Sequence, residues 1–224
     1  MPSCLIVGAS RGIGREFVNQ YLADGWTVHA TARGGDDLAD LEQAGATAHR
    51  ADAAKEDDLK TLAAALPDDL DVIVHNAGVN TASMEGPITD VDAEEWTRVM
   101  QVNALAPILS ARNLIPKLKK PGGTFAILSS LMGSIADNGF GGFWSYRMSK
   151  AAVNMAAQNL AHQFEGDGTA ILTLHPGHVQ TDMGGAGAPV TPTESVTGLR
   201  NVIAKKAPGD GTLFVDFRGK ALAW

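Results

Sequence analysis

The sequence predicts a single-domain α/β fold in which helices cover both faces of a doubly wound parallel sheet. Short apolar runs alternate with stretches of helical periodicity almost to the end of the chain, which is typical of parallel strands joined by helices. The length of 224 residues and the hydrophobic content of 45% allow one sizeable core, so one domain over residues 1–224 is expected. Strands are expected at residues 3–7, 26–31, 46–50, 71–75, 123–129, 169–175 and 212–216.

A glycine-rich turn follows the first expected strand and favours the binding of an anion. The apolar run 4–7 stops at a segment that reads Gly8-Ala-Ser-Arg-Gly12-Ile-Gly14, and a helical pattern follows. A strand, a tight turn and a helix N-terminus present unpaired backbone N–H groups and a positive dipole end, so a pyrophosphate is expected here. The alternative is that the glycines serve only a tight turn and close packing, since their spacing departs from the common dinucleotide fingerprint.

Most candidate residues directly follow the expected strands. In a doubly wound sheet, ligands bind beyond the carboxyl ends of the strands, where the strand order reverses. One crevice is therefore expected to collect the residues at these positions, which are Gly8, Arg33, Asp52, Asn76, Ser130 and Pro176. The Gly- and Pro-rich stretch 184–192 is expected to form a mobile substrate loop over this crevice.

The end of the second expected strand indicates which dinucleotide is preferred. A site selective for NAD(H) places an acid there, about 20 residues beyond the glycine turn, to bind the ribose 2′-hydroxyl. Here the strand ends in Arg33 without an acid, and Arg11 in the glycine turn adds a second cation, so NADP(H) is expected in preference to NAD(H). The alternative is two surface arginines, with Asp36 and Asp37 close enough to compete for them.

Tyr146 and Lys150 lie four residues apart at the head of an expected helix, 146–164. On a helix this spacing puts the phenol and the ammonium on one face. An adjacent cation lowers the pKa of a phenol from about 10, so the two residues form a candidate acid and base. The alternative is a half-buried tyrosine beside a lysine that reaches to solvent.

Pro107 interrupts a stretch that otherwise reads as one helix over 93–119. Because proline has no N–H, the carbonyl of Asn103 loses its helical partner. That carbonyl could hold a water linked to Lys150 and so supply protons to Tyr146. The alternative is a kink that only curves the helix around the sheet.

Two further groups have simpler interpretations. His175 and His178 are closely spaced, but the proline and glycine between them break any helix and no third ligand is apparent, so no metal site is expected. Phe140, Phe143 and Trp144 precede the candidate tyrosine and could be packing residues or an apolar wall for a ketone or aldehyde with a hydrophobic group.

Composition excludes several classes of partner. The net charge of -7 and the pI of about 5.3, without a basic cluster, argue against nucleic acid, so the expected partner is a small molecule. No apolar run approaches the length of a membrane span, and residues 1–10 lack the pattern of a signal peptide. With a single cysteine, Cys4, an internal disulfide is excluded, and a cytoplasmic location is expected.

The ordered motifs together resemble the classical short-chain dehydrogenase/reductase (SDR) family over nearly the whole chain. They are the glycine turn, Asn76-Ala77-Gly78, Ser130, Tyr146 with Lys150, and Pro176-Gly177. The segment 129–150 and the ending 217–224 are most similar to the C-factor and sniffer-type carbonyl reductase branch. The resemblance implies the Rossmann form of the doubly wound fold, with the catalytic site built into the same domain.

The resemblance also implies a catalytic tetrad of Asn103, Ser130, Tyr146 and Lys150. Ser130 would hold the substrate oxygen, Tyr146 would exchange the proton, and Lys150 would bind the nicotinamide ribose while lowering the pKa of the tyrosine. The residues implied for cofactor binding are Gly8, Ser10, Arg11, Gly12, Ile13, Gly14, Arg33, Asp52, Asn76, Ala77, Gly78, Tyr146, Lys150, Pro176, Gly177, Val179 and Thr181.

Three positions keep a second interpretation beside this resemblance. The stretch from Ser130 to Tyr146 is longer than in most relatives, which makes Ser134 a rival serine, although the Ser-Ser-x-x-Gly match favours Ser130. His75 stands where the family usually has an asparagine. Asp52 could cap the next helix instead of, or as well as, contacting an adenine.

The expected function is that of an NADPH-dependent oxidoreductase that transfers a hydride to a small ketone or aldehyde, or from a secondary alcohol in reverse. The alternative is a nucleotide-binding signalling or sensor protein of the C-factor type that needs little turnover. Epimerases that use a similar Tyr-x-x-x-Lys motif need more C-terminal length than this chain has. Exposed faces of the helices near 93–119 and 146–164 could pair to form a homodimer or homotetramer.

Overall fold

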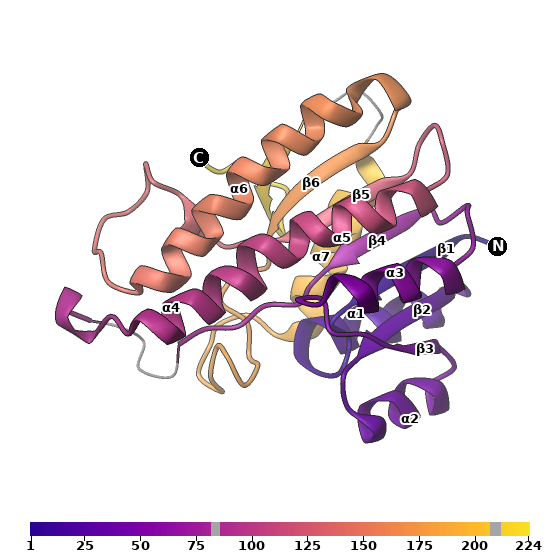
Figure 1. The fold of residues 1–224 in the computed structure, drawn as a ribbon, viewed down its shortest axis with the longest axis horizontal. Helices are drawn as coiled ribbons and strands as arrows, with labels where there is room; N and C mark the ends of the chain where they lie inside the picture. Colours follow the sequence, from indigo (N-terminus) through magenta and orange to yellow (C-terminus); the bar gives the residue numbers. More distant parts are fainter. Residues whose placement is uncertain (82–85, 207–211) are drawn as a thin grey trace.

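A parallel sheet forms the centre of the protein and carries helices on both faces (Figure 1). The computed structural model describes residues 1–81, 86–206 and 212–224. The seven strands are β1 Ser3–Val7, β2 Thr27–Ala32, β3 Thr47–Arg50, β4 Val72–His75, β5 Thr124–Leu128, β6 Ala170–His175 and β7 Leu213–Asp216. They are arranged in the order β3-β2-β1-β4-β5-β6-β7. Each expected strand is present within one residue of its expected ends, and the doubly wound α/β fold is confirmed.

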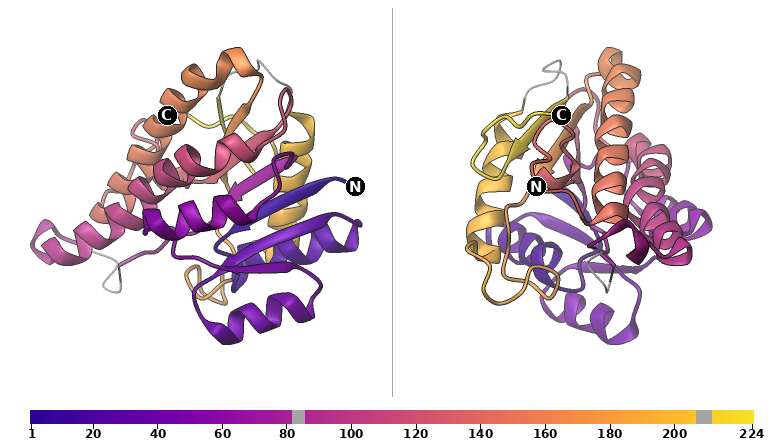
Figure 2. Two further views of the ribbon diagram at one scale, coloured as in Figure 1. Left: turned by 45° about the vertical axis from the view of Figure 1, so that its right-hand side comes forward. Right: turned by 90° about the vertical axis from the view of Figure 1, so that its left-hand side faces the viewer.

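The helices form two layers around the sheet, as the two further views show (Figure 2). Helices α1 Gly12–Ala23, α2 Gly35–Gln43 and α7 Pro192–Lys205 pack on one face, and α3 Glu56–Ala65, α5 Ala106–Leu114 and α6 Trp144–Phe164 pack on the other. In the described ranges, no helix has both the length and the apolar character needed to cross a membrane.

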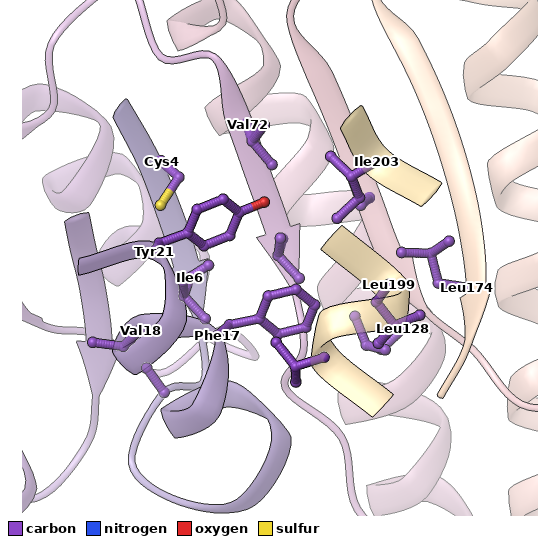
Figure 3. Close-up of a cluster of buried hydrophobic side chains, with 14 of the residues drawn as sticks. Cys4, Ile6, Phe17, Val18, Tyr21, Val72, Leu128, Leu174, Leu199 and Ile203 are labelled. Atoms are coloured by element: carbon purple, nitrogen blue, oxygen red, sulfur yellow. The ribbon is translucent and has the colours of Figure 1, made fainter. Parts of the chain in front are cut away.

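Alternating strand residues supply two separate cores. Cys4 and Ile6 of β1 pack under α1 and α7, whereas Leu5 and Val7 pack under α3, α5 and α6. In the first core, Phe17 of α1 lies between the sheet and the side chains of α7 (Figure 3). Because both faces are covered, the central strands β1, β4 and β5 are buried along their whole length and mostly apolar, whereas the edge strand β3, Thr47–Arg50, is partly exposed and polar.

The strand order reverses between β1 and β4, and this brings two candidate segments together. Val7 pairs with His75 at the carboxyl ends of the two strands, and the backbone N–H groups of Asn76 and Ala77 both donate to the carbonyl of Val7 (3.0 Å). The glycine turn after β1 and the Asn76-Ala77-Gly78 segment after β4 are therefore neighbours. This is the switch point at which ligands bind in such sheets.

The stretch 93–119 is helical but changes its winding. Helix α4, Ala93–Met100, begins at Asp92, whose carboxylate accepts from the N–H of Glu95 (2.9 Å). A π-helical turn follows over Gln101–Leu105, then α5 and the 3₁₀ turn Ile115–Lys117. Pro107 thus lies in the first turn of α5, and Asn103 lies in the widened turn before it.

The expected loop 184–192 lies in a segment that folds back on itself. Val179 and Val190 form an isolated parallel bridge, and the N–H of Gln180 donates to the carbonyl of Val190 (2.9 Å). Thr191 caps α7 by accepting from Glu194, so Pro192 belongs to that helix and not to the loop. The mobility of residues 184–191 stays a prediction.

Candidate active site

A crevice of about 470 Å³ opens at the carboxyl ends of the strands and collects most of the predicted site residues. Those that line it are Gly8, Ser10, Arg11, Gly12, Ile13, Arg33, Asp52, Asn76, Ala77, Gly78, Tyr146, Lys150, Pro176 and Thr181. The predicted residues outside its lining are Gly14, Asn103, Ser130, Gly177 and Val179. Of these, Gly177 packs against the Phe217 ring, where an added Cβ would lie at 3.0 Å, and Val179 forms the bridge with Val190.

The glycine turn leaves no space for side chains between β1 and α1. A Cβ on Gly14 would lie 2.1 Å from the carbonyl oxygen of Gly8, so this glycine permits close helix packing rather than ligand contact. Asn76 Nδ2 donates to the same carbonyl (2.6 Å), and Thr31 Oγ1 accepts from the N–H of Gly8 (2.9 Å). Helix α1 starts at Gly12 with no side-chain cap, so its first amides face the crevice and fit the phosphates of a dinucleotide.

Arg33 is exposed at the carboxyl end of β2 and lines the crevice. A second cation, Arg50, donates from Nη1 to the carbonyl of Arg33 (3.2 Å). Arg11 pairs with Asp182 (2.6 Å), both side chains being largely exposed, so the acid that competes for it is Asp182 and not an aspartate of the 36–37 pair. These cations suit a dinucleotide that carries a 2′-phosphate.

Asp52 does not cap α3. That helix begins at Glu56, and no side chain caps its N-terminus. Asp52 Oδ1 accepts instead from the N–H of Ala54 (3.1 Å), and the N–H of Asp52 donates to Asp58 Oδ2 (2.8 Å). The capping interpretation was therefore wrong, because three further residues separate Asp52 from the helix, while its place in the crevice lining leaves the adenine interpretation open.

Tyr146 and Lys150 lie together at the floor of the crevice. Burial raises the pKa of Tyr146 above its usual value, and a side-chain hydrogen bond with Ser130 offsets part of this rise. Lys150 Nζ lies 5.6 Å from the centre of the Tyr146 ring and donates to the carbonyl of Leu128 (2.9 Å). Burial lowers the pKa of Lys150 to about 8.

The expected lowering of the Tyr146 pKa by Lys150 was wrong. Removing the phenolate from water raises the pKa by more than the hydrogen bond with Ser130 lowers it, and the ammonium of Lys150 donates to a backbone carbonyl. Tyr146 therefore carries its proton at neutral pH. A phenol in that form is ready to act as an acid.

Ser130 is the serine that reaches Tyr146. Besides its hydrogen bond with the phenol, Ser130 Oγ accepts from the N–H of Met132 (3.1 Å) and so begins the 3₁₀ turn Leu131–Gly133. Ser134 Oγ accepts instead from the N–H of Asp137 (3.1 Å) and donates to the carbonyl of Trp224 (3.3 Å). The contacts thus favour Ser130 over its rival.

Asn103 lies behind the crevice and holds two segments together. Its Oδ1 accepts from the N–H of Val79 (2.8 Å), while Nδ2 donates to the carbonyl of Val79 (2.8 Å) and to Ser149 Oγ (3.0 Å). The side chain therefore connects the loop after β4 to the catalytic helix α6. The role of the Asn103 backbone carbonyl in a proton relay stays a prediction.

His75 points away from the crevice into the second core. Its Nδ1 lies 3.0 Å from Ser110 Oγ, and burial together with the charge of Lys150 lowers the pKa of the imidazole to about 3. His75 is thus neutral at physiological pH. Its position beneath α5 explains how a residue other than asparagine is accommodated here.

Several other residues line the site and were not predicted from the sequence. Thr31 could have been found, because it lies two positions before Arg33 and so on the same face of β2. Asp182 and Leu128 could not, because Asp182 acts through a partner far away in the chain and Leu128 through its backbone carbonyl. In the described ranges, no three potential metal ligands cluster.

The fold and the crevice define the class of protein, and comparisons agree with it. The family model described as short chain dehydrogenase matches residues 3–189, so the chain belongs to the short-chain dehydrogenase/reductase family. It is an oxidoreductase of the NAD(P)-dependent SDR type, with a substrate that is not established.

Individual relatives place it near the branch expected from the sequence. The chain is 37% identical to the C-signal of Myxococcus xanthus over 156 residues, which cover 69% of this chain and 93% of that protein. The carbonyl reductase Sniffer of D. melanogaster superimposes with a TM-score of 0.92 at 29% identity, covering 100% of both chains. A putative short-chain dehydrogenase/reductase from Burkholderia multivorans with bound NADP gives 0.93 at 32% identity, covering 100% of this chain and 99% of that one. The resemblance to this branch is confirmed.

Proposed function

We propose that the protein is an NADPH-dependent carbonyl reductase acting on a small ketone or aldehyde, and on the secondary alcohol in reverse. The observation that carries this proposal is the group of Ser130, Tyr146 and Lys150, of which Tyr146 and Lys150 line the crevice at the carboxyl ends of the strands. The preference for NADPH is supported by Arg33 at the end of β2 and by the NADP bound in the similar Burkholderia multivorans structure.

Separate residues of the protein would bind the cofactor and transfer the proton. The α1 amides and the cations Arg11 and Arg33 would hold the phosphates, and Lys150 would hold the ribose. When bound, the reduced nicotinamide supplies the hydride. Ser130 would stabilise the developing alkoxide, a contact worth about 2.7 to 4 kcal/mol in other enzymes. Tyr146, protonated at neutral pH, would deliver the proton to that oxygen.

Tyr146→Phe tests the proposal because it removes the reacting hydroxyl and keeps the ring. NADPH affinity should be unchanged, while single-turnover hydride transfer to a reducible carbonyl should fall by at least ~10²-fold. The measurement is NADPH absorbance after mixing saturated enzyme with a panel of ketones and aldehydes. A Phe variant as fast as the parent would exclude Tyr146 as the acid.

A signalling role is the second candidate, and the similarity to the C-signal is the observation that favours it. A sensor would bind NADPH tightly and reduce none of the carbonyls in the panel. The presence of Ser130, Tyr146 and Lys150 in contact weighs against that outcome.

We also propose that the protein self-associates as a homodimer or homotetramer through α5 and α6.

A further inference from the structure

Arg147 lies between the proposed acid and the proposed ribose ligand in the sequence, and its side chain is 8% exposed. Among the described residues, no carboxylate forms an ion pair with its guanidinium, and its buried Nη2 has no hydrogen-bond partner. A buried cation without a counter-charge is costly, and burial accordingly lowers the pKa of Arg147. Because burying this guanidinium costs free energy of folding, we expect Arg147 to have a role other than stabilising the core.

The guanidinium joins two segments that are separate in the chain. Nη1 donates to the carbonyl of Met132 (3.4 Å), and Nε donates to the carbonyl of Gly141 (3.2 Å). The guanidinium carbon also lies 4.4 Å from the centre of the Phe140 ring, in cation–π contact. Arg147 therefore links the 3₁₀ turn Leu131–Gly133 to the chain that enters α6.

The first of these segments carries the proposed catalytic serine. Ser130 begins the turn, and Gly133 packs so closely on α6 that an added Cβ would lie 2.7 Å from the backbone of Lys150. Asn154 Nδ2 donates to the Gly133 carbonyl as well (3.4 Å). The turn is therefore held against α6 by contacts that do not involve Arg147. The carbonyl of Met132, to which Arg147 donates, thus belongs to a segment that is already fixed in place.

The second segment, residues 139–143, is bonded mainly to its immediate neighbours in the chain: the N–H of Gly139 donates to the carbonyl of Asp137 (3.0 Å), and the N–H of Gly141 donates to Asn138 Oδ1 (3.1 Å). The side chain of Arg147 joins it to the serine-bearing turn. Gly141, Gly142 and Phe143 have φ of 69°, 65° and 49°, a left-handed run that is unfavourable for phenylalanine. Phe140 is 75% exposed, so its ring buries little area apart from its contact with Arg147. We call residues 139–143 the wall.

The wall stands at the same end of the molecule as the crevice. The chain between β5 and α6 projects beyond the carboxyl ends of the strands, beside the start of α6 (Figure 1). Directly after the wall, Trp144 Nε1 donates to the carbonyl of Gly86 (3.2 Å), which joins this rim to the segment after β4. None of residues 139–144 lines the crevice itself, so this apolar rim would contact only a substrate group that extends beyond the crevice.

We propose that Arg147 is a positioning residue that holds the wall against the serine-bearing turn and thereby sets the affinity for bulky apolar carbonyl substrates. This rests on the proposed function for its substrate. Arg147 is not among the residues that line the crevice, and its side-chain hydrogen bonds go to Met132 and Gly141. Its loss therefore loosens the wall without altering proton transfer or cofactor binding.

The test compares Arg147→Met, Arg147→Lys and Phe140→Ala with Arg112→Met, a control on the exposed side of α5. Hydrogen exchange of the amides in 139–143, followed by mass spectrometry, reports on the wall without requiring activity. KM and kcat for benzaldehyde and propanal, with NADPH affinity, report on the substrate side. Arg147→Met should speed exchange in the wall and raise KM for benzaldehyde by about tenfold, with little change for propanal or NADPH.

Arg147→Lys and Phe140→Ala test whether the effect of Arg147→Met on KM arises from the contact between Arg147 and the wall. Arg147→Lys keeps a donor and a cation over the ring, so it should restore most of the benzaldehyde KM. Phe140→Ala, at an exposed position that does not endanger folding, should raise the same KM without adding to the effect of Arg147→Met in the double variant. Equal KM changes for both aldehydes, or unchanged exchange in the wall, would overturn the proposal. If the parent reduces no ketone or aldehyde of the wider panel, the proposed function fails, while the hydrogen-exchange data still test whether Arg147 holds the wall.

Discussion

The protonation state of Tyr146 follows from a competition between two effects at one side chain. Spacing alone suggests that the ammonium of Lys150 dominates, and the sequence therefore predicted a lowered pKa. Burial costs the phenolate its hydration, and this larger effect raises the pKa instead. The depth at which a side chain is buried depends on residues distant in the sequence, which is why this shift could not be predicted from a five-residue motif.

Arg33 is the residue on which the cofactor preference depends most directly. Arg33→Ala should weaken NADPH binding by about 1.5 to 3 kcal/mol, the range for hydrogen bonds to charged groups, and leave NADH binding nearly unchanged. Titration of both cofactors by nicotinamide fluorescence measures the difference, with NADH as the internal control. Equal affinities of the parent protein for the two cofactors would remove the argument for a 2′-phosphate site.

Lys150 makes cofactor affinity depend on pH. Its pKa in the free protein is lowered to about 8, so the ammonium is present below pH 8 and is lost as the pH rises through that value. If the ammonium binds the ribose, NADPH affinity should be constant below about pH 7 and should fall above pH 8, because binding then requires uptake of a proton. Fluorescence titrations from acid to alkaline pH check this, with circular dichroism as the control for folding. A flat affinity profile through pH 9.5 would contradict it.

At the scale of elements, strands were easier to predict than helix details. Buried parallel strands are continuous apolar runs that end at glycine or polar residues, so their positions needed no tertiary information. The sequence predicted an interruption of the helix at Pro107, but not its form, which is a π-helical turn over Gln101–Leu105 in which Asn103 bonds to Val79 and Ser149. Asp52 was misjudged as a cap for a related reason, since the start of α3 is set by packing as well as by local sequence.

Pro107→Ala tests whether the widened turn matters for catalysis. Alanine supplies the N–H that proline lacks, which favours regular α-helical winding through Asn103 and withdraws its carbonyl from any relay water. Turnover should fall more than NADPH affinity, with the largest loss where proton delivery limits the rate. Turnover across pH and cofactor titration measure the two quantities. A variant with the parent pH profile would leave the proline as a simple kink.

At the scale of the whole molecule, the topology explains why residues from so many parts of the chain meet. All strands run in the same direction, so the segments after β1, β2, β4, β5 and β6 open at one edge of the sheet. Arg33, Asn76 and Pro176 were placed there from strand ends alone, and each lines the crevice. Asn103 and Gly14 were also singled out, but the structure gives them supporting contacts behind it.

The outer faces of α5 and α6 and of the turn before α5 leave large apolar side chains exposed. Ile108 is 42% exposed and Met155 is 63% exposed, with Leu105 and Met148 at similar values. Such a surface on neighbouring helices suits a two-fold interface in which each copy covers the same patch of the other. Light scattering of the parent should therefore give two or four times the chain mass of 23.4 kDa.

Met155→Lys should convert that assembly to single chains, because it places a charge where the two copies would meet and removes apolar area from the interface. Leu213→Lys is the matched control, since Leu213 is 40% exposed on β7, away from α5 and α6. The control should keep the parent mass, and both variants should keep NADPH affinity because neither position lines the crevice. A parent that scatters as a single chain at every concentration, or a Met155→Lys variant that keeps the parent mass, would exclude this face as the interface.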